Sequence, residues 1–297
     1  MVATLIGFIL AGFLSVGDAC SSCKPTALCP DHLVQENAAV AQLAPLLKSK
    51  DPFERSRTLA KLGELDAKHP LCPTADTAKL VAGLLDDESV DVRTEAAKAL
   101  GNGMHPDVAI TALIGALDAT KKGLAKIPFG MGDWGAAPGQ KEDPKVTERR
   151  KAREELNALE TTIVAGLVKL PDDRSVAALV ELLPQLTRWN GEMLATTTEG
   201  ILKLGARGGV EAVVARIKTS PVGDTGGRWG GPDTTGHTLR DLLAAAAAAK
   251  GTDPVPPWIE DKNAKDQPDW DKWFTKNQKH FPAKLGKYTL AELQKKT

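Results

Sequence analysis

The four cysteines are the residues of this sequence best suited to redox or metal chemistry. They are Cys20, Cys23, Cys29 and Cys72, and three of them lie within the stretch CSSCKPTALC. A C-x-x-C pair can cycle between thiols and a disulfide, and four thiolates can hold zinc. The spacing is irregular for zinc, however, and no βαβ pattern surrounds the pair. We therefore expect structural disulfides, with all three pairings open.

An envelope redox or metal-binding module that uses this cysteine cluster is the alternative function. The sequence CSSCK also resembles the lysine type of haem-attachment sequence, but it lacks the histidine or similar context that haem binding needs. We therefore expect no cofactor and no bound metal. Visible absorbance or bound zinc would favour the alternative.

Two glycine-rich loops carry a second set of candidate residues. They span residues 123–144 and 220–236, and each holds a tryptophan between glycines, in GDWGA and GRWGG. Long loops in a compact domain are usually functional, and exposed tryptophan and arginine are enriched at binding hot spots. In the alternative interpretation the tryptophans fold back over the edge of the domain and the glycines only permit the turns. The candidate partner-binding residues of the loops are Asp133, Trp134, Arg228 and Trp229.

The N-terminus predicts export. No charged side chain precedes Asp18, and the small residues Gly17 and Ala19 suit a signal peptidase. The apolar stretch Val2–Val16 is shorter than the roughly 20 residues that a membrane-spanning helix needs. We therefore expect a signal peptide over residues 1–19, a periplasmic or extracellular protein, and no membrane insertion after cleavage.

The amino-acid composition limits both the fold class and the kind of partner that can be expected. The 297 residues carry 38 basic and 38 acidic side chains, so the net charge is zero. A protein that binds nucleic acid through counterion release normally has a basic excess, so we expect no nucleic-acid partner. Aromatic residues make up only 4% of the chain, and alanine and leucine dominate. This composition favours closely packed helices and predicts an all-α protein.

A repeat supplies the elements that must position these residues. The stretch LLKSKDPFERSRTLAKLG (Leu46–Gly63) aligns with LLDDESVDVRTEAAKALG (Leu84–Gly101), and matched positions lie 38 residues apart. Each stretch predicts the end of one helix, a short turn and a second helix with apolar residues at helical spacing. We expect Gly63 and Gly101 to close the second helices in the left-handed conformation.

The same order of features recurs along the chain. One further stretch, Val176–Gly205, predicts a whole helix pair, whereas in two other pairs a loop separates the first helix from the second. No pair can bury its apolar face without a neighbour, so about five pairs would form one array. The separated helices are expected over Asp107–Ala119 with Val146–Leu170, and over Gly209–Thr219 with Thr238–Lys250.

The stretch Leu84–Gly101 resembles a HEAT repeat in its Leu-Leu, polar turn, Val-Arg, Ala-Ala and Leu-Gly pattern. The resemblance is to secreted bacterial HEAT-like proteins, and it implies a right-handed α-solenoid. In that family the residues matching Arg93 and Asp91 chiefly link adjacent repeats. Iron-binding HEAT-like enzymes carry repeated His-Glu dipeptides, and this sequence has none. We therefore expect no catalytic residues.

The expected domain organisation follows from these segments. After the signal peptide come a cysteine-containing segment (20–34), a HEAT-like repeat domain (35–251) and a C-terminal cap (252–297). The cap contains DWDKWFTKNQKHF, in which Trp270, Trp273, Phe274 and Phe281 fall at helical spacing. We expect these aromatics to cover the last repeat, with an aromatic ligand site as the alternative.

These features predict an exported, non-catalytic scaffold that binds another protein. An enzyme with a pocket at the loop edge is a third interpretation, but no nucleophile, base and orienting residue occur at interpretable spacing. Second helices of such arrays usually line the concave face. The further candidate contact residues are Arg57, Glu95, Lys98, Glu199 and Lys203.

Overall fold

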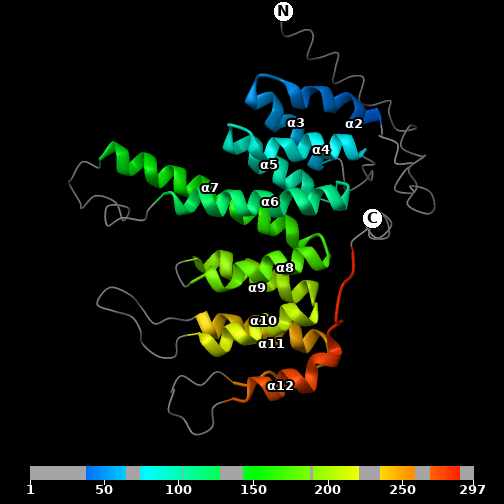
Figure 1. Ribbon diagram of the computed structural model, residues 1–297, viewed down its shortest axis with the longest axis vertical. Coiled ribbons are helices and arrows are strands. Elements are labelled where there is room, and N and C mark those ends of the chain that lie inside the picture. Colours follow the sequence, from blue (N-terminus) through cyan, green and yellow to red (C-terminus); the bar gives the residue numbers. More distant parts are fainter. Residues whose placement is uncertain are drawn as a thin grey trace, which may run out of the picture. The chain divides into compact units, whose positions relative to one another are not determined.

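The computed structural model describes residues 38–64, 74–102, 104–127, 143–187, 190–220, 235–257 and 268–287. Every regular element within these ranges is a helix, and none is a strand, which confirms the all-α fold (Figure 1). The chain forms two compact units, which divide between Gly166 and Leu167. The N-terminal cysteines, the signal segment and the two tryptophans of the glycine-rich loops lie outside the described ranges.

Unit 1 contains three helix pairs. Its first helices contact one another along the unit, since η2 packs on α4 and α4 packs on α6, while α3 packs on α5. The helices are α2 (Ala38–Leu43) with the 3-10 helix η2 (Ala44–Lys48), α3 (Pro52–Glu64), α4 (Ala75–Gly83) with η3 (Leu84–Asp86), α5 (Val90–Gly101), α6 (Pro106–Ala125) and α7 (Pro144–Val168), whose last two residues belong to unit 2.

Leucines at matched positions of the first two pairs are buried. Leu47 and Leu85 lie where the first helices end, and Leu62 and Leu100 lie near the ends of the second helices. All four side chains are at most 7% exposed. The 38-residue offset therefore places equivalent leucines in equivalent core positions.

The prediction that Gly63 and Gly101 close their helices in the left-handed conformation is wrong. Neither Gly63 nor Gly101 has a positive φ, because the backbone at both is still helical and no reversal is needed there. Gly101 instead allows a close approach, since a Cβ at this position would lie 2.5 Å from the Cα of Gly166. The carbonyl of Gly63 accepts a hydrogen bond from Asn102 Nδ2 at 3.3 Å. Gly205, in contrast, follows the last residue of its helix with φ +73° and closes that helix in the left-handed conformation.

Unit 2 contains two helix pairs and a final helix. Here α8 packs on α10, α10 packs on α12, and α9 packs on α11. The helices are α8 (Asp173–Leu182) with η5 (Leu183–Gln185), α9 (Gly191–Leu204), α10 (Arg207–Thr219), α11 (Thr235–Ala249) and α12 (Trp270–Asn277) with η7 (Gln278–His280).

The helix α12 packs on α10, and three aromatic residues in and after it are buried. Trp270 and Trp273 are each 7% exposed, and Phe281 is 1% exposed. The indole of Trp273 donates to the Asp253 carbonyl at 3.2 Å, and the Asp253 amide donates to Asn277 Oδ1 at 2.9 Å. These aromatics are therefore core residues of the cap and do not form an exposed ligand site.

The third pair is longer than the sequence pattern indicated. The helix α6 continues to Ala125, beyond the expected end at Ala119. Thr120 is the last buried residue of α6, and no side chain between Asp143 and Ala158 is buried. Within the described ranges, no helix combines the length and apolar character needed to cross a membrane.

Candidate functional site

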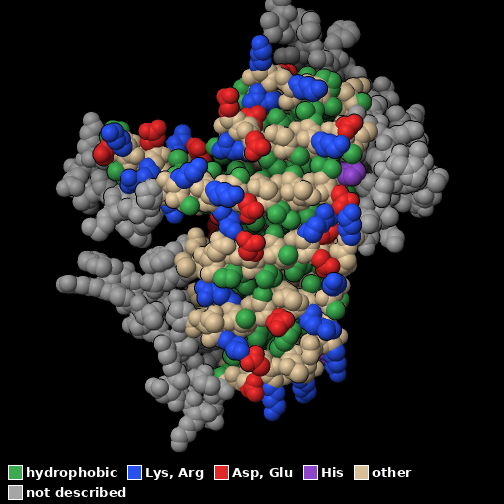
Figure 2. Space-filling view, in the orientation of Figure 1, with side chains coloured by type: hydrophobic (Ala, Val, Ile, Leu, Met, Phe, Trp, Pro, Cys, Tyr) green, Lys and Arg blue, Asp and Glu red, His purple; other side chains and the backbone are tan. Residues whose placement is uncertain are grey.

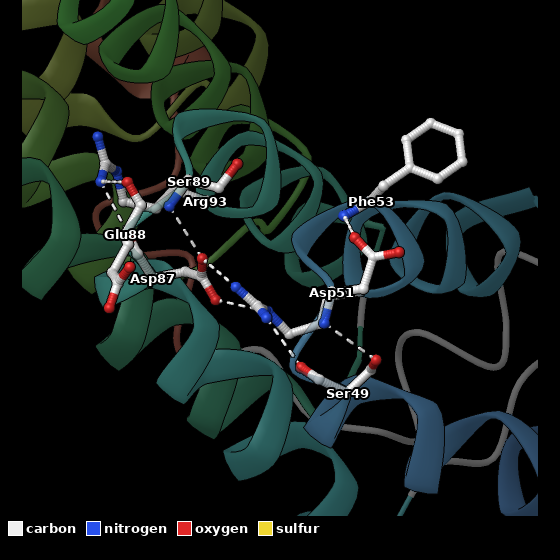
Figure 3. Close-up of polar contacts among 8 residues, drawn as sticks. Ser49, Asp51, Phe53, Asp87, Glu88, Ser89 and Arg93 are labelled. Atoms are coloured by element: carbon white, nitrogen blue, oxygen red, sulfur yellow. Dashed lines mark hydrogen bonds and ion pairs between the residues drawn. The ribbon is translucent and has the colours of Figure 1, made fainter.

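A largely buried polar site joins the first two helix pairs of unit 1. Arg55 of α3 donates from Nε and Nη2 to the two carboxylate oxygens of Asp87, both at 2.8 Å (Figure 3). The two side chains are 13% and 8% exposed, so water has little access to the pair. A bidentate pair between arginine and a carboxylate fixes orientation as well as distance. The pair therefore holds α3 in register with the turn before α5.

Each repeat arginine also closes the turn of its own repeat. Arg55 Nη1 donates to the carbonyl of Ser49 at 2.8 Å, and Arg93 Nη1 donates to the carbonyl of Asp87 at 2.7 Å. Both bonds span six residues, and both arginines occupy the same position of the repeat. The carbonyls at the end of a 3-10 helix otherwise lack a hydrogen-bond donor. The arginine side chain supplies that donor.

The electrostatics keep both members of the pair charged. Burial acts to raise the pKa of Asp87, but hydrogen bonds from Arg55 and from the Ser89 amide outweigh burial and hold this pKa below its ordinary value. The hydrogen bond to Asp87 raises the pKa of Arg55. An acid that is fully ionised at neutral pH has no proton to give, so the pair suits a structural role and not acid catalysis.

The HEAT resemblance predicted the linking residues only in part. The link is made by Arg55, which is the equivalent of Arg93 in the preceding repeat. Its acidic partner is Asp87 and not Asp91. Asp91 is exposed in the first turn of α5. A carboxylate there stabilises the helix by its interaction with the positive end of the helix dipole. The sequence signal available for Asp87 was its position, because it aligns with Ser49 in the turn between the two helices of a pair.

Unit 1 carries three of the predicted partner-contact residues on its second helices. Arg57 of α3 is exposed, Glu95 of α5 is half-buried and Lys98 of α5 is exposed. Arg57 and Glu95 are matched positions of the repeat, and the second helices α3 and α5 pack side by side, so the two residues share one face of these helices. Lys98 Nζ lies 2.6 Å from Glu95 Oε1. This face therefore carries charges of both signs.

Unit 2 carries the other two predicted contact residues of the helices. Glu199 and Lys203 lie on α9, and both are exposed. They are four residues apart, so they lie on the same side of the helix. Over the face drawn in Figure 2, basic and acidic side chains are interspersed across the described helices.

The remaining predicted site residues lie where the structure gives no description. These are the loop residues Asp133, Trp134, Arg228 and Trp229 and the cysteines Cys20, Cys23, Cys29 and Cys72. Their roles in binding and in disulfides stay predictions. Across the part of the chain that is described, no three histidine, cysteine or acidic side chains gather in a way that could hold a metal.

A buried carboxylate in α7 was not singled out in the sequence. Glu160 is 7% exposed, and burial raises its pKa, while the charge of Lys121 acts in the opposite direction. Raised acid pKa values occur at catalytic sites, but they also occur in packing. The adjacent positions Leu159 and Ile163 are buried core residues. We therefore interpret Glu160 as a carboxylate that the packing of α7 places in the interior.

Comparisons with known proteins assign no family. No known protein family matches the sequence, and no curated protein matches it. Among solved structures, the chain is similar to an engineered protein from the Northeast Structural Genomics Consortium, with 15% identity, coverage of 71% of this chain and 96% of that chain, and a TM-score of 0.31. A second engineered protein from the same consortium shows 18% identity, coverage of 72% and 59%, and a TM-score of 0.27. The resemblance to HEAT-like repeat proteins stays a prediction.

Proposed function

We propose that the protein is an exported, non-catalytic scaffold that binds another protein through the exposed face of its second helices. The observation that carries this proposal is the packing of α3 on α5, fixed by the Arg55–Asp87 pair, which gives Arg57, Glu95 and Lys98 a common face. A rigid helical surface with preset charges binds with little loss of conformational entropy. In this proposal the pairs continue as a right-handed α-solenoid.

The mixed charge of this face supports a protein partner. A polyanion would favour a face of one sign, whereas Arg57 lies at the position matched by Glu95. A folded partner with complementary charges would gain association rate and specificity, and salt would weaken its binding. The proposal includes Glu199 and Lys203 as the corresponding contacts of unit 2.

Site-specific photo-crosslinking tests this function. A photoreactive residue is placed at Arg57 or Lys98 in the exported, full-length protein, and at Lys79 of α4 as a control. Lys79 is 66% exposed but lies on a first helix. We expect a defined crosslinked species from the second-helix positions and none from Lys79. Equal crosslinking from all three positions would contradict the proposed face.

A charge-swapped variant tests the same face independently. In Arg57→Glu combined with Glu95→Lys, the total charge is unchanged but the pattern is inverted. We expect this variant to lose the crosslinked species while keeping its thermal stability. The Trp134→Ala, Trp229→Ala variant is the matched comparison, because loss of the species there would place recognition in the glycine-rich loops instead.

A further inference from the structure

After its last helix, the C-terminal cap turns back along unit 2. After η7, residues 281–287 contain no helix, and Figure 1 draws them in red as they leave α12. Phe281 is buried, whereas most of the residues that follow are exposed. Gly286 has φ +83°, which favours glycine. We call residues 281–287 the C-terminal strap.

The first attachment of the strap is to α10. The carbonyl of Pro282 accepts a hydrogen bond from the amide of Arg207 at 2.8 Å. Arg207 is the first residue of α10, and amides in the first turn of a helix have no acceptor within that helix. The strap therefore satisfies a donor that α10 itself cannot satisfy.

The second attachment is to α8 through Asp173. One carboxylate oxygen of Asp173 accepts the Leu285 amide at 2.9 Å, and the other accepts the Gly286 amide at 3.3 Å. The amide of Asp173 in turn donates to the Gly286 carbonyl at 3.1 Å. These bonds join residues that are 112 and 113 positions apart in the sequence. Hydrogen bonds to an ionised carboxylate are stronger than neutral ones.

The role of Asp173 is separate from helix capping. The cap of α8 is Asp172, whose side chain accepts the Arg174 amide and also pairs with the Arg174 guanidinium at 2.8 Å. Asp173 is therefore not needed to begin the helix. The hydrogen bonds between the strap and α8 use backbone groups of the strap and, on α8, the amide and the carboxylate of Asp173. The second attachment therefore depends on the side chain of Asp173.

We propose that the C-terminal strap, held by Asp173 and by the Arg207 amide, makes α8, α10 and α12 open as one cooperative unit. In a helix-pair array each pair contacts only its neighbours, so an end can fray without disturbing the far end. The strap instead bonds the chain that follows α12 to α8, the first helix that lies wholly in unit 2. Opening of α12 then breaks its packing on α10 and also the hydrogen bonds of the strap to α8.

Hydrogen exchange on the full-length protein tests this proposal. In the wild type, we expect the Leu285 and Gly286 amides to be protected, and the amides of α8 and α12 to exchange through one common opening. In Asp173→Ala, we expect the strap amides to lose protection and the α12 amides to exchange about tenfold faster than those of α8. Free exchange of the strap amides in the wild type would overturn the proposal.

Two further variants distinguish loss of the strap from the general effect of removing a carboxylate at the start of a helix. Glu192→Ala removes an exposed first-turn carboxylate from α9, so it repeats the loss of a helix-dipole contact without touching the strap. We expect it to leave α8 and α12 coupled. Gly286→Ala has nothing within 4 Å to obstruct it, but alanine disfavours φ +83°. We expect Gly286→Ala to uncouple α12 as Asp173→Ala does, and continued coupling in both would overturn the proposal.

Discussion

Gly101 of α5 and Gly166 of α7 approach so closely that a Cβ added at Gly101 would lie 2.5 Å from the Cα of Gly166. No side-chain rotation can relieve such an overlap, because the obstructing atom belongs to the backbone. The two glycines therefore let the second helices of the second and third pairs meet backbone to backbone within unit 1.

Substitution Gly101→Ala should destabilise unit 1 by about 2 to 3 kcal/mol, since the helices must move apart to admit one methyl group. Urea unfolding followed by circular dichroism measures the change. Gly115→Ala is the control, because this exposed glycine of α6 has nothing within 4 Å of an added Cβ. There alanine should stabilise the helix by about 0.5 to 1 kcal/mol. Equal effects at both positions would contradict the backbone contact.

Removal of the arginine that links the first two pairs should lower the melting temperature by several degrees. In Arg55→Ala the carboxylate of Asp87 loses both of its guanidinium hydrogen bonds while it remains largely shielded from water. Arg55→Lys should restore only part of the loss, because lysine cannot form the bidentate pair. Arg57→Ala, two residues further along and exposed, should leave the melting temperature nearly unchanged. A similar loss in both alanine variants would sink the structural assignment of the pair.

Glu160 should make stability fall as the pH rises. Its pKa in the folded protein is raised by burial, so the folded state binds more protons than the unfolded state between the ordinary glutamate pKa, about 4.3, and the raised value. Stability is therefore lost as the pH rises through that interval. Glu160→Gln should remove this loss and gain about 1 kcal/mol at pH 7. Urea unfolding of the wild type and of Glu160→Gln across pH measures the change.

His105 should be replaceable with a gain in stability. It precedes Pro106 at the start of α6 and has φ 38°, a left-handed conformation that costs energy for a residue with a Cβ. Its Nδ1 is buried without a hydrogen-bond partner among the described residues. His105→Gly should raise the free energy of unfolding by about 1 kcal/mol, because glycine accepts this φ. Thermal unfolding measures the gain, and a lower melting temperature would show that the imidazole contributes to packing.

The helices could be predicted because burial follows the helical period. The alignment matches Leu47 with Leu85 and Leu62 with Leu100, and all four of these leucines are buried. The end of α6 was missed, because residues after Thr120 are not buried and leave no apolar stripe to follow. The expected behaviour of Gly101 was wrong for a different reason: a glycine that ends a helix and a glycine that admits a neighbouring helix look the same in one sequence.

The polar sites were less predictable than the core. The repeat identified the arginine position, but Asp87 and Asp91 are both acidic and only the fold shows which one faces Arg55. The bonds of Asp173 to Leu285 and Gly286 use backbone amides more than one hundred residues away. Backbone amides occur at almost every position, so no side-chain pattern announces such a contact.

The closure of α10 by α12 has a consequence for how this chain could change its length in evolution. The helix α12 already packs on α10, and Trp270, Trp273 and Phe281 are buried. A duplicated pair added after α12 would meet exposed lysines of α12 and η7. They are Lys272, Lys276 and Lys279. Within the described part of the chain, a new pair would therefore find a better place ahead of α12 than after it.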